Sequence, residues 1–168
     1  PDEYDTNYTA LGMSYWSLMD SGNYCDNGKT PCGLTAYERD LLGWRPLTVL
    51  ERSTTVRLRP LEAGGAGYKV VNEANPDEYY VLENRQHVGW DNGLMKLGHG
   101  MLVVHVDYDE TAWKNNMLNT NATHQRMSFI PANNRYVGPY NAESSADLLN
   151  ALGGQPYPGT EENTALTN

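Results

Sequence analysis

Near its start the chain reads Gly12-Met13-Ser14-Tyr15-Trp16-Ser17-Leu18-Met19-Asp20-Ser21-Gly22, and this segment constrains every other part of it. Its glycines, serines and aspartate favour turns over regular helices or strands. Trp16, Leu18 and Met19, in contrast, are side chains that proteins usually bury. A turn can bury such side chains only if other elements pack over it. We therefore expect a tight, buried turn centred on Leu18 and Met19, which we call the Met turn (residues 12–22).

The composition is that of a folded domain. The chain has 168 residues, 39% of them hydrophobic, which suits one domain or a substantial part of one. No apolar run reaches the length needed to span a membrane. The net charge is −9 and no basic cluster is present, so we expect no nucleic-acid partner. Twelve tyrosines and four tryptophans accompany one phenylalanine, which is typical of wet binding grooves and of tyrosine-rich sheets alike.

One short helix is expected after the Met turn. Thr35 is a suitable N-cap, and Glu38 three residues later completes the pattern of a capping box. Gly43 is placed to end the helix. Apolar residues recur at helical spacing at Leu34, Tyr37, Leu41 and Leu42. We expect this helix to pack against the Met turn.

From Leu47 onward the pattern changes to that of strands. The continuous apolar run Met101–Val106 suits a central strand that is buried on both faces. A turn is expected at Asn75-Pro76-Asp77. From about Ala132 the chain is rich in Asn, Gly, Pro and Tyr without periodicity, which predicts a loop-rich tail. Strand-like patterns predict further strands at residues 54–59, 68–72, 78–84 and 126–130.

An ordered set of motifs resembles one protein family. The chain opens Pro1-Asp2-Glu3-Tyr4-Asp5-Thr6, and the Met turn follows. Further matching motifs, in the same order, are Leu34-Thr35-Ala36-Tyr37-Glu38, Leu42-Gly43-Trp44, Tyr79-Tyr80-Val81-Leu82-Glu83-Asn84-Arg85-Gln86 and Gly98-His99-Gly100-Met101-Leu102-Val103-Val104-His105-Val106-Asp107. Together they resemble the immune inhibitor A family of secreted bacterial zinc metallopeptidases. In that family a zinc helix, H-E-x-x-H-x-x-G-L, directly precedes the Pro-Asp motif, and this chain contains no H-E-x-x-H.

The resemblance implies that the chain is the C-terminal portion of a secreted zinc metalloendopeptidase catalytic domain, found outside the cell or at its surface. In the full enzyme, zinc would activate a water and a helix Glu would act as general base. The two His ligands and that Glu would lie upstream of Pro1, so we expect the chain alone to be inactive. Its partners would be a protein or peptide substrate and the remainder of its own catalytic domain.

The resemblance also suggests roles for residues of the Met turn and the segment before it. Asp2 falls where metzincin-like enzymes place a third zinc ligand, and Glu3 is the competing candidate. The alternative is that neither binds zinc and both belong to a solvated acidic face. Met19 is expected to be buried and to form the floor of the zinc site by filling space beneath the metal.

Polar residues interrupt two of the predicted strands. Glu83 lies in one, and His105 and Asp107 share a face of the central strand. Together with Arg85 they could form a network around the zinc site, or a satisfied polar cluster that only sets strand register. Calcium is a second candidate cofactor, because Asp107, Asp109 and Glu110 offer carboxylate oxygens, although they lack the spacing of an EF-hand loop.

Cys25 and Cys32 are the two cysteines of the chain, at the ends of a turn-rich loop. Because the resembling family is exported, we expect them to form a disulfide, with two free thiols as the alternative.

The predicted fold class is α+β and mostly β: a Met-turn segment and one short helix, followed by an antiparallel sheet assembly and a loop-rich tail. We expect one structural unit, incomplete at both ends. Its regions are 1–46 (the C-terminal part of a zincin-like catalytic subdomain), 47–131 (the antiparallel β region) and 132–168 (the tail). The alternative function is a secreted β-rich binding module that recognises a sugar or peptide through exposed Tyr and Trp.

Overall fold

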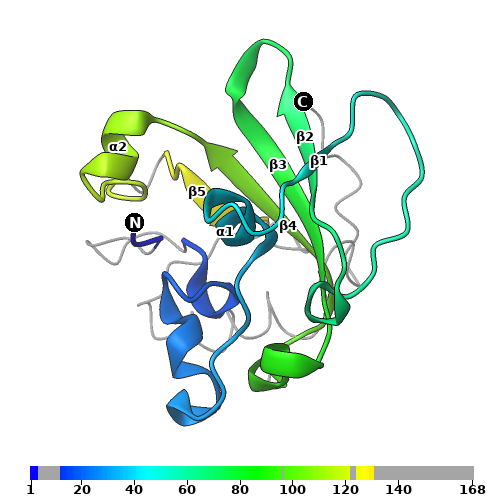
Figure 1. Ribbon diagram of the computed structural model, residues 1–168. Helices are drawn as coiled ribbons and strands as arrows, with labels where there is room; N and C mark the ends of the chain where they lie inside the picture. Colours follow the sequence, from blue (N-terminus) through cyan, green and yellow to red (C-terminus); the bar gives the residue numbers. More distant parts are fainter. Residues whose placement is uncertain (4–11, 96, 122–123, 131–168) are drawn as a thin grey trace.

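The computed structural model describes residues 1–3, 12–95, 97–121 and 124–130. Its centre is a five-stranded sheet whose spatial order follows the chain, β1-β2-β3-β4-β5. Figure 1 shows α1 in front of this sheet and the blue segment that holds the Met turn below α1, to the left of the strands. The strands are β1 (Thr48–Val49), β2 (Tyr68–Asn72), β3 (Asn75–Arg85), β4 (Gly100–Asp107) and β5 (Met127–Phe129). The predicted α+β, mostly β class is therefore confirmed.

The sheet is antiparallel from β2 to β5, whereas β1 joins the edge of β2 in parallel. Thr48 pairs with Tyr68, and the connection between these strands crosses over, as a parallel pair requires. The expected sheet was antiparallel, so this edge differs from the prediction. The predicted tail at 132–168 lies outside the described residues.

The hairpin between β2 and β3 is tighter than predicted. β3 already begins at Asn75, so the turn expected at Asn75-Pro76-Asp77 is wrong, and Glu73-Ala74 form the turn instead. The register shifts between Val71 and Asn72, which pair with Tyr79 and Asn75. Pro76 therefore lies where the pairing of β2 with β3 is irregular, and the sheet tolerates its lack of an N–H at such a position.

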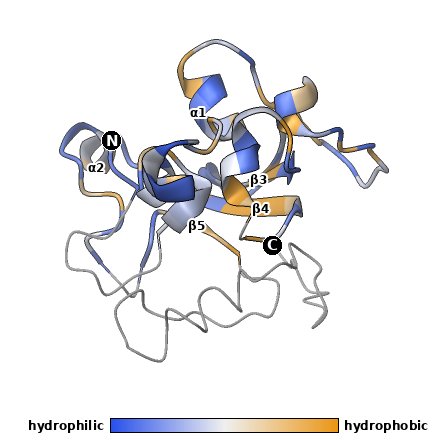
Figure 2. Ribbon diagram, turned by 90° about the horizontal axis from the view of Figure 1, so that it is seen from below, coloured by the Kyte–Doolittle hydropathy of each residue, from blue (hydrophilic) through white to orange (hydrophobic). Residues whose placement is uncertain are grey.

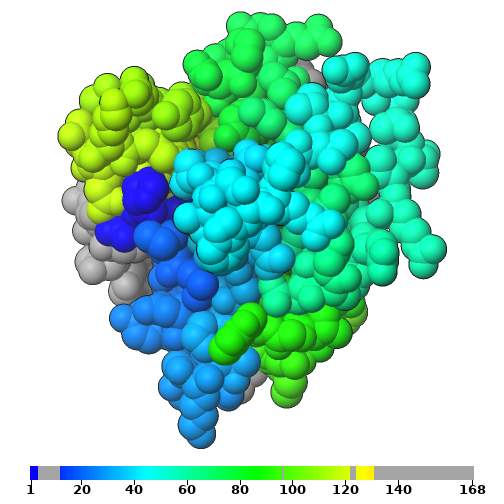
Figure 3. Space-filling view, in the orientation of Figure 1, coloured from blue at the N-terminus to red at the C-terminus, as the bar shows by residue number. Residues whose placement is uncertain are grey.

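The strand predicted at residues 54–59 is also wrong, because this stretch is irregular and largely exposed. The segment projects from the body of the molecule at the upper right of Figure 3. The adjoining residue Pro60 forms one isolated bridge, with Asn84. The edge of β2 that lies away from β3 is paired with the two-residue strand β1 and not with residues 54–59.

Two short helices flank the turn segment. α1 (Ala36–Leu41) begins at the predicted capping box, with the Thr35 side chain accepting from the Glu38 N–H. Gly43, at a φ of +70°, follows it in the left-handed conformation that glycine adopts readily. α2 (Glu110–Lys114) was not predicted, and the Asp109 side chain caps it by accepting from the Ala112 N–H. No helix within the described ranges is long and apolar enough to cross a membrane.

The core lies between one face of the sheet and the segments that cover it. Tyr79, Val81, Glu83 and Arg85 alternate along β3 as its buried residues. The register pairs Val81 with Val104, which places the even-numbered residues of β4 on this same face. Figure 2 shows β4 as a hydrophobic strand beside β3. The covering side chains include Met13, Trp16, Ala36, Tyr37, Leu61, Leu94 and Trp113.

Candidate functional site

A buried ion cluster centred on Arg85 joins the sheet to the Met turn. The Arg85 side chain is 1% exposed. It donates from Nη1 to Glu83 Oε1 at 2.9 Å, and from Nε and Nη2 to the Asp91 carboxylate at 2.7 and 2.6 Å. It also donates to two backbone carbonyls, of Trp16 at 3.2 Å and of Gly33 at 3.0 Å. One guanidinium thus fixes the Met turn, the loop before α1 and the 3-10 helix Gly89–Leu94.

The electrostatics of this cluster favour a charged Arg85. Burial opposes its charge, but Glu83 and Asp91 outweigh that effect and raise the pKa of the guanidinium. Burial also raises the pKa of Glu83, against the opposing influence of Arg85 and of the Ala36 N–H. Removing one member of such a group leaves an uncompensated buried charge, which is far more costly than removing the whole group.

A second set of bonds ties the start of α1 to the Met turn and the sheet. Glu38 accepts from the Thr35 N–H at 2.5 Å and from the Ser17 hydroxyl at 2.9 Å. Ser17 Oγ in turn accepts from the Met19 N–H at 3.0 Å. Glu83 Oε2 accepts from the Ala36 N–H at 2.5 Å. The capping box that the sequence predicts therefore also connects the Met turn, α1 and β3 by hydrogen bonds.

Asp20 closes the Met turn from within. Its Oδ2 accepts from the N–H groups of Met13 at 3.0 Å and Ser14 at 2.6 Å. Ser14 has a φ of +50°, which is unusual for a residue with a side chain. Burial raises the pKa of Asp20 to about 6, although the hydrogen bonds to its carboxylate act in the opposite direction.

The two candidate zinc ligands occupy different environments. Glu3 donates its N–H to the Met19 carbonyl at 2.9 Å, and its side chain is buried with Oε2 unpartnered among the described residues. Burial, and then the neighbouring Glu38, raise the pKa of Glu3 well above its usual range. Asp2 is only half-buried, and its carboxylate accepts from Asn116 Nδ2 at 2.7 Å. Figures 1 and 3 show this first segment between the Met turn and α2.

The expectation that Met19 is buried is wrong, because 39% of it is exposed. Met13 is the methionine beneath the turn, fully buried beside Trp16. The bond from the Met19 N–H to Ser17 Oγ closes the turn locally, while Met13 and Trp16 fill the core below it. Leu18 packs against that core and is half-buried.

Glu83, His105 and Asp107 do not form one network. Glu83 is opposite Leu102 in the register, so it faces the core, whereas His105 and Asp107 belong to the other face of β4. His105 Nε2 pairs with Glu78 at 2.9 Å. Asp107 pairs with His124 at 2.7 Å and with Arg126 at 3.0 Å. The sheet therefore separates Glu83 from His105 and Asp107, so the three form neither of the two single clusters considered, the network around a zinc site or the polar cluster that sets strand register.

The carboxylates proposed for calcium have other partners. Asp109 caps α2, and Glu110 pairs with Lys114 at 2.7 Å on its surface. Within the part of the chain that the structure describes, no group of three or more His, Cys, Asp or Glu could hold a metal ion. These residues alone do not supply a complete zinc or calcium site, and Asp2 or Glu3 could contribute only one ligand of a larger one.

Cys25 and Cys32 are both buried, and the structure holds them as free thiols rather than the predicted disulfide. They nevertheless share a side-chain hydrogen bond, which lowers the pKa of Cys25 and raises that of Cys32. Gly22 allows this approach, because a Cβ there would lie 2.3 Å from Cys32 Sγ. The Cys25 thiol also donates to the Tyr15 carbonyl at 3.7 Å, and formation of the disulfide stays a prediction.

The residue that sequence reasoning missed is Asp91. It lies in a Gly-rich segment without periodicity, where no sequence signal marked it as buried or as the partner of Arg85. Arg85 itself was marked only by its place in the alternation of β3. Comparison with models of known protein families, with curated proteins and with solved structures found no match for this chain.

Proposed function

We propose that this chain is the C-terminal portion of the catalytic domain of a secreted zinc metalloendopeptidase, and that it supports the zinc site rather than forming it alone. One observation carries the proposal: the segments that resemble the immune inhibitor A family converge on one buried polar network. Trp16 and Ser17 come from the Met turn, Glu38 from the helix motif, and Glu83 and Arg85 from the strand motif.

The energetics of this network support a positioning role. Burying two carboxylates and a guanidinium costs desolvation free energy that apolar residues would not incur. In return, each hydrogen bond requires one arrangement of turn, helix and strand. A peptidase needs that precision, because the groups around a metal must be held within fractions of an ångström. The network would thus hold the Met turn and the Asp2-Glu3 segment in place.

Of the two candidate ligands, we favour Asp2. It is half-buried, and its neighbour Glu3 is hydrogen-bonded to Met19, so Asp2 stands next to the Met turn with an accessible carboxylate. The Glu3 carboxyl is buried against Ser17 and Glu38 and supports the turn from inside. The remaining ligands would be histidines on a helix elsewhere in the domain, as the resemblance implies, and that helix would also cover Met19.

The test compares this chain with the same chain extended by the coding sequence that precedes it in its gene. We expect the chain alone to bind no zinc tightly and to cleave no casein. We expect the extended protein to contain an H-E-x-x-H segment, one zinc ion by elemental analysis and zinc-dependent peptidase activity. An extension without that segment, or tight zinc binding by the chain alone, would contradict the proposal.

Variants of the extended protein separate the two acidic candidates. Asp2→Asn should lose zinc, whereas Glu3→Gln should keep zinc and fold as before, because the amide replaces a carboxyl whose neutral form burial already favours. Asp26→Asn changes an exposed acidic residue outside the network and serves as the matched control. Loss of zinc from Glu3→Gln with retention by Asp2→Asn would reverse the assignment.

A further inference from the structure

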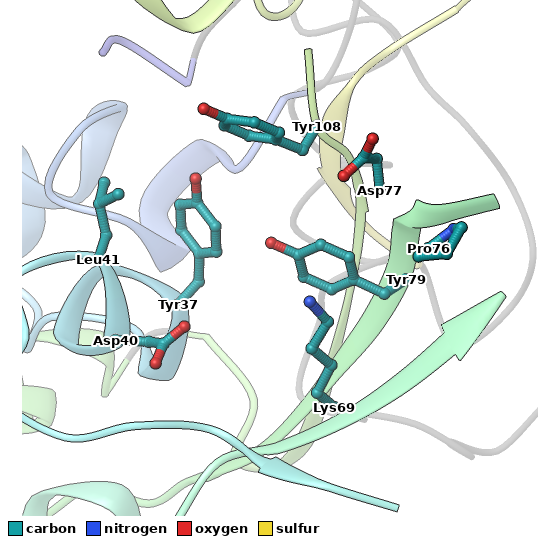
Figure 4. Close-up of a pocket in the computed structure, with 8 residues that line it drawn as sticks. All are labelled: Tyr37, Asp40, Leu41, Lys69, Pro76, Asp77, Tyr79 and Tyr108. Atoms are coloured by element: carbon teal, nitrogen blue, oxygen red, sulfur yellow. The ribbon is translucent and has the colours of Figure 1, made fainter. Parts of the chain in front are cut away.

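A pocket of about 270 Å³ lies where α1 meets the sheet, away from the Arg85 cluster. α1 contributes Tyr37 and Asp40, β2 contributes Lys69, β3 contributes Asp77 and Tyr79, and Tyr108 follows β4. Figure 4 shows these side chains around one space, with the Tyr79 hydroxyl pointing into it. Asp40, Asp77 and Tyr108 are exposed, so the pocket opens to solvent on their side.

Tyr79 provides a hydroxyl to this pocket. Its residue is 8% exposed, and its hydroxyl has no hydrogen-bond partner among the described residues. The hydroxyl reaches the open space of the pocket and makes no hydrogen bond to the described part of the protein, so it is available to a ligand there. Burial, followed by Asp40 and Asp77, raises the pKa of Tyr79 to about 12, so its hydroxyl keeps its proton and can donate it.

The walls of the pocket are held in place before any ligand arrives. Tyr37 accepts from Trp113 Nε1 at 2.5 Å, and the ring of Trp113 packs against Tyr108 with centroids 5.1 Å apart. The Tyr108 N–H also donates to the Asp77 carbonyl at 2.8 Å. The aromatic rings are therefore fixed to one another, which lowers the entropic cost of binding.

The polar groups of the pocket include both donors and acceptors. Tyr37 and Tyr79 can donate from their hydroxyls, and Lys69, whose Nζ lies 3.5 Å from the centroid of the Tyr79 ring, can donate from its ammonium. Asp40 uses one oxygen to accept from the Leu47 N–H, and the Asp77 carboxylate has no partner among the described residues. Carboxylates only accept.

This mixture disfavours a charged ligand. Lys69 would repel a cation, and Asp40 and Asp77 would repel an anion. A neutral ring that carries several hydroxyls satisfies both kinds of group, because each hydroxyl can donate and accept, and its C–H face can pack on an aromatic ring. We propose that this pocket binds a sugar, as a single hexopyranose ring. The proposal needs no zinc and is independent of the peptidase assignment.

The test titrates the whole chain with methyl glycosides of glucose, galactose and mannose and with N-acetylglucosamine, followed by NMR. We expect at least one to bind with a dissociation constant on the order of 1–10 mM, as suits a ligand of roughly a dozen non-hydrogen atoms. Tyr79→Phe removes only the hydroxyl and should weaken binding roughly 3- to 10-fold. Tyr24→Phe, a change at an exposed tyrosine outside the pocket, should leave it unchanged.

Two further variants identify the class of ligand. For a sugar, Lys69→Met and Asp77→Asn should both weaken binding, because each removes one partner. Argininamide and acetate serve as cationic and anionic probes. The proposal is overturned if no sugar of the panel binds. It is also overturned if neither variant weakens sugar binding and either Lys69→Met tightens argininamide binding or Asp77→Asn tightens acetate binding.

Discussion

Arg85 on β3 donates a hydrogen bond to the carbonyl oxygen of Trp16, 69 residues earlier in the chain, at 3.2 Å inside the core. A charged donor on a central strand thus satisfies a backbone group of an irregular turn. Displacing the turn would leave both the carbonyl and part of the guanidinium buried without partners, which is expensive. The hydrogen bond from Arg85 therefore fixes the position of the Met turn relative to the sheet.

Replacing Arg85 with methionine should destabilise the chain by about 3–5 kcal/mol, because Glu83 and Asp91 would be left as uncompensated buried charges. Urea unfolding monitored by tryptophan fluorescence measures the effect. The matched control is Arg126→Met, which removes a partly exposed partner of Asp107 and should cost about 1 kcal/mol or less. Equal losses for the two variants would show that the Arg85 cluster has no special role.

The two methionines of the Met turn should respond differently to truncation. Met13→Ala creates a cavity in the core and should cost about 2–5 kcal/mol. Met19→Ala in the same chain should change the free energy of unfolding by about 0.5 kcal/mol or less, because the side chain is partly exposed. Thermal melts of the two variants side by side decide the matter. A loss at Met19 as large as that at Met13 would place Met19 in the core after all.

Asp20 should make stability depend on pH. Its pKa is raised from 3.8 to about 6 in the folded state, so the folded chain holds this proton more tightly than the unfolded chain does. The resulting stability is fully present below about pH 4 and is lost as the pH rises to about 6, by up to roughly 3 kcal/mol.

Asp20→Asn removes this titration while keeping the shape of the side chain. As the pH rises through that window, the unfolding free energy of the wild type should therefore decrease relative to that of the variant. Glu83 titrates in both proteins and cancels in the comparison, whereas the charge of Asp20 helps to raise the pKa of Glu3, so Glu3 contributes to the difference. A difference that does not change with pH would mean that Asp20 is ionised throughout, held so by the N–H groups of Met13 and Ser14.

Oxidation should join Cys25 to Cys32, because their side chains already interact and each influences the pKa of the other. Closing this short loop should stabilise the chain by about 2.5 kcal/mol on the chain-entropy model. Intact mass before and after alkylation without reductant reports the bond, and melting with and without reductant reports its effect. Two alkylatable thiols after air oxidation would contradict the prediction. The Cys25→Ser, Cys32→Ser double variant should show no effect of reductant.

Local patterns were sufficient for much of the secondary structure. The capping box of Thr35 and Glu38 predicts α1 because both halves of its hydrogen bonding lie within four residues. The apolar run at 101–106 predicts β4 because a strand between two others needs no polar face. The stretch at 54–59 has an equally good pattern but pairs with no strand and is largely exposed, and a pattern alone does not reveal whether a segment finds a partner strand.

The candidate site depended more heavily on tertiary structure. The sequence alone marked Glu83 as a buried acid in need of a partner, since a polar residue in an apolar alternation must be satisfied. It named Arg85 among the possible partners of Glu83, but it did not reveal the bond from the Ala36 N–H, or that His105 lies across the sheet. Periodicity places residues on a face of their own strand, whereas the register between strands and the packing of the Met turn on them arise from contacts between distant segments, and these only the folded chain defines.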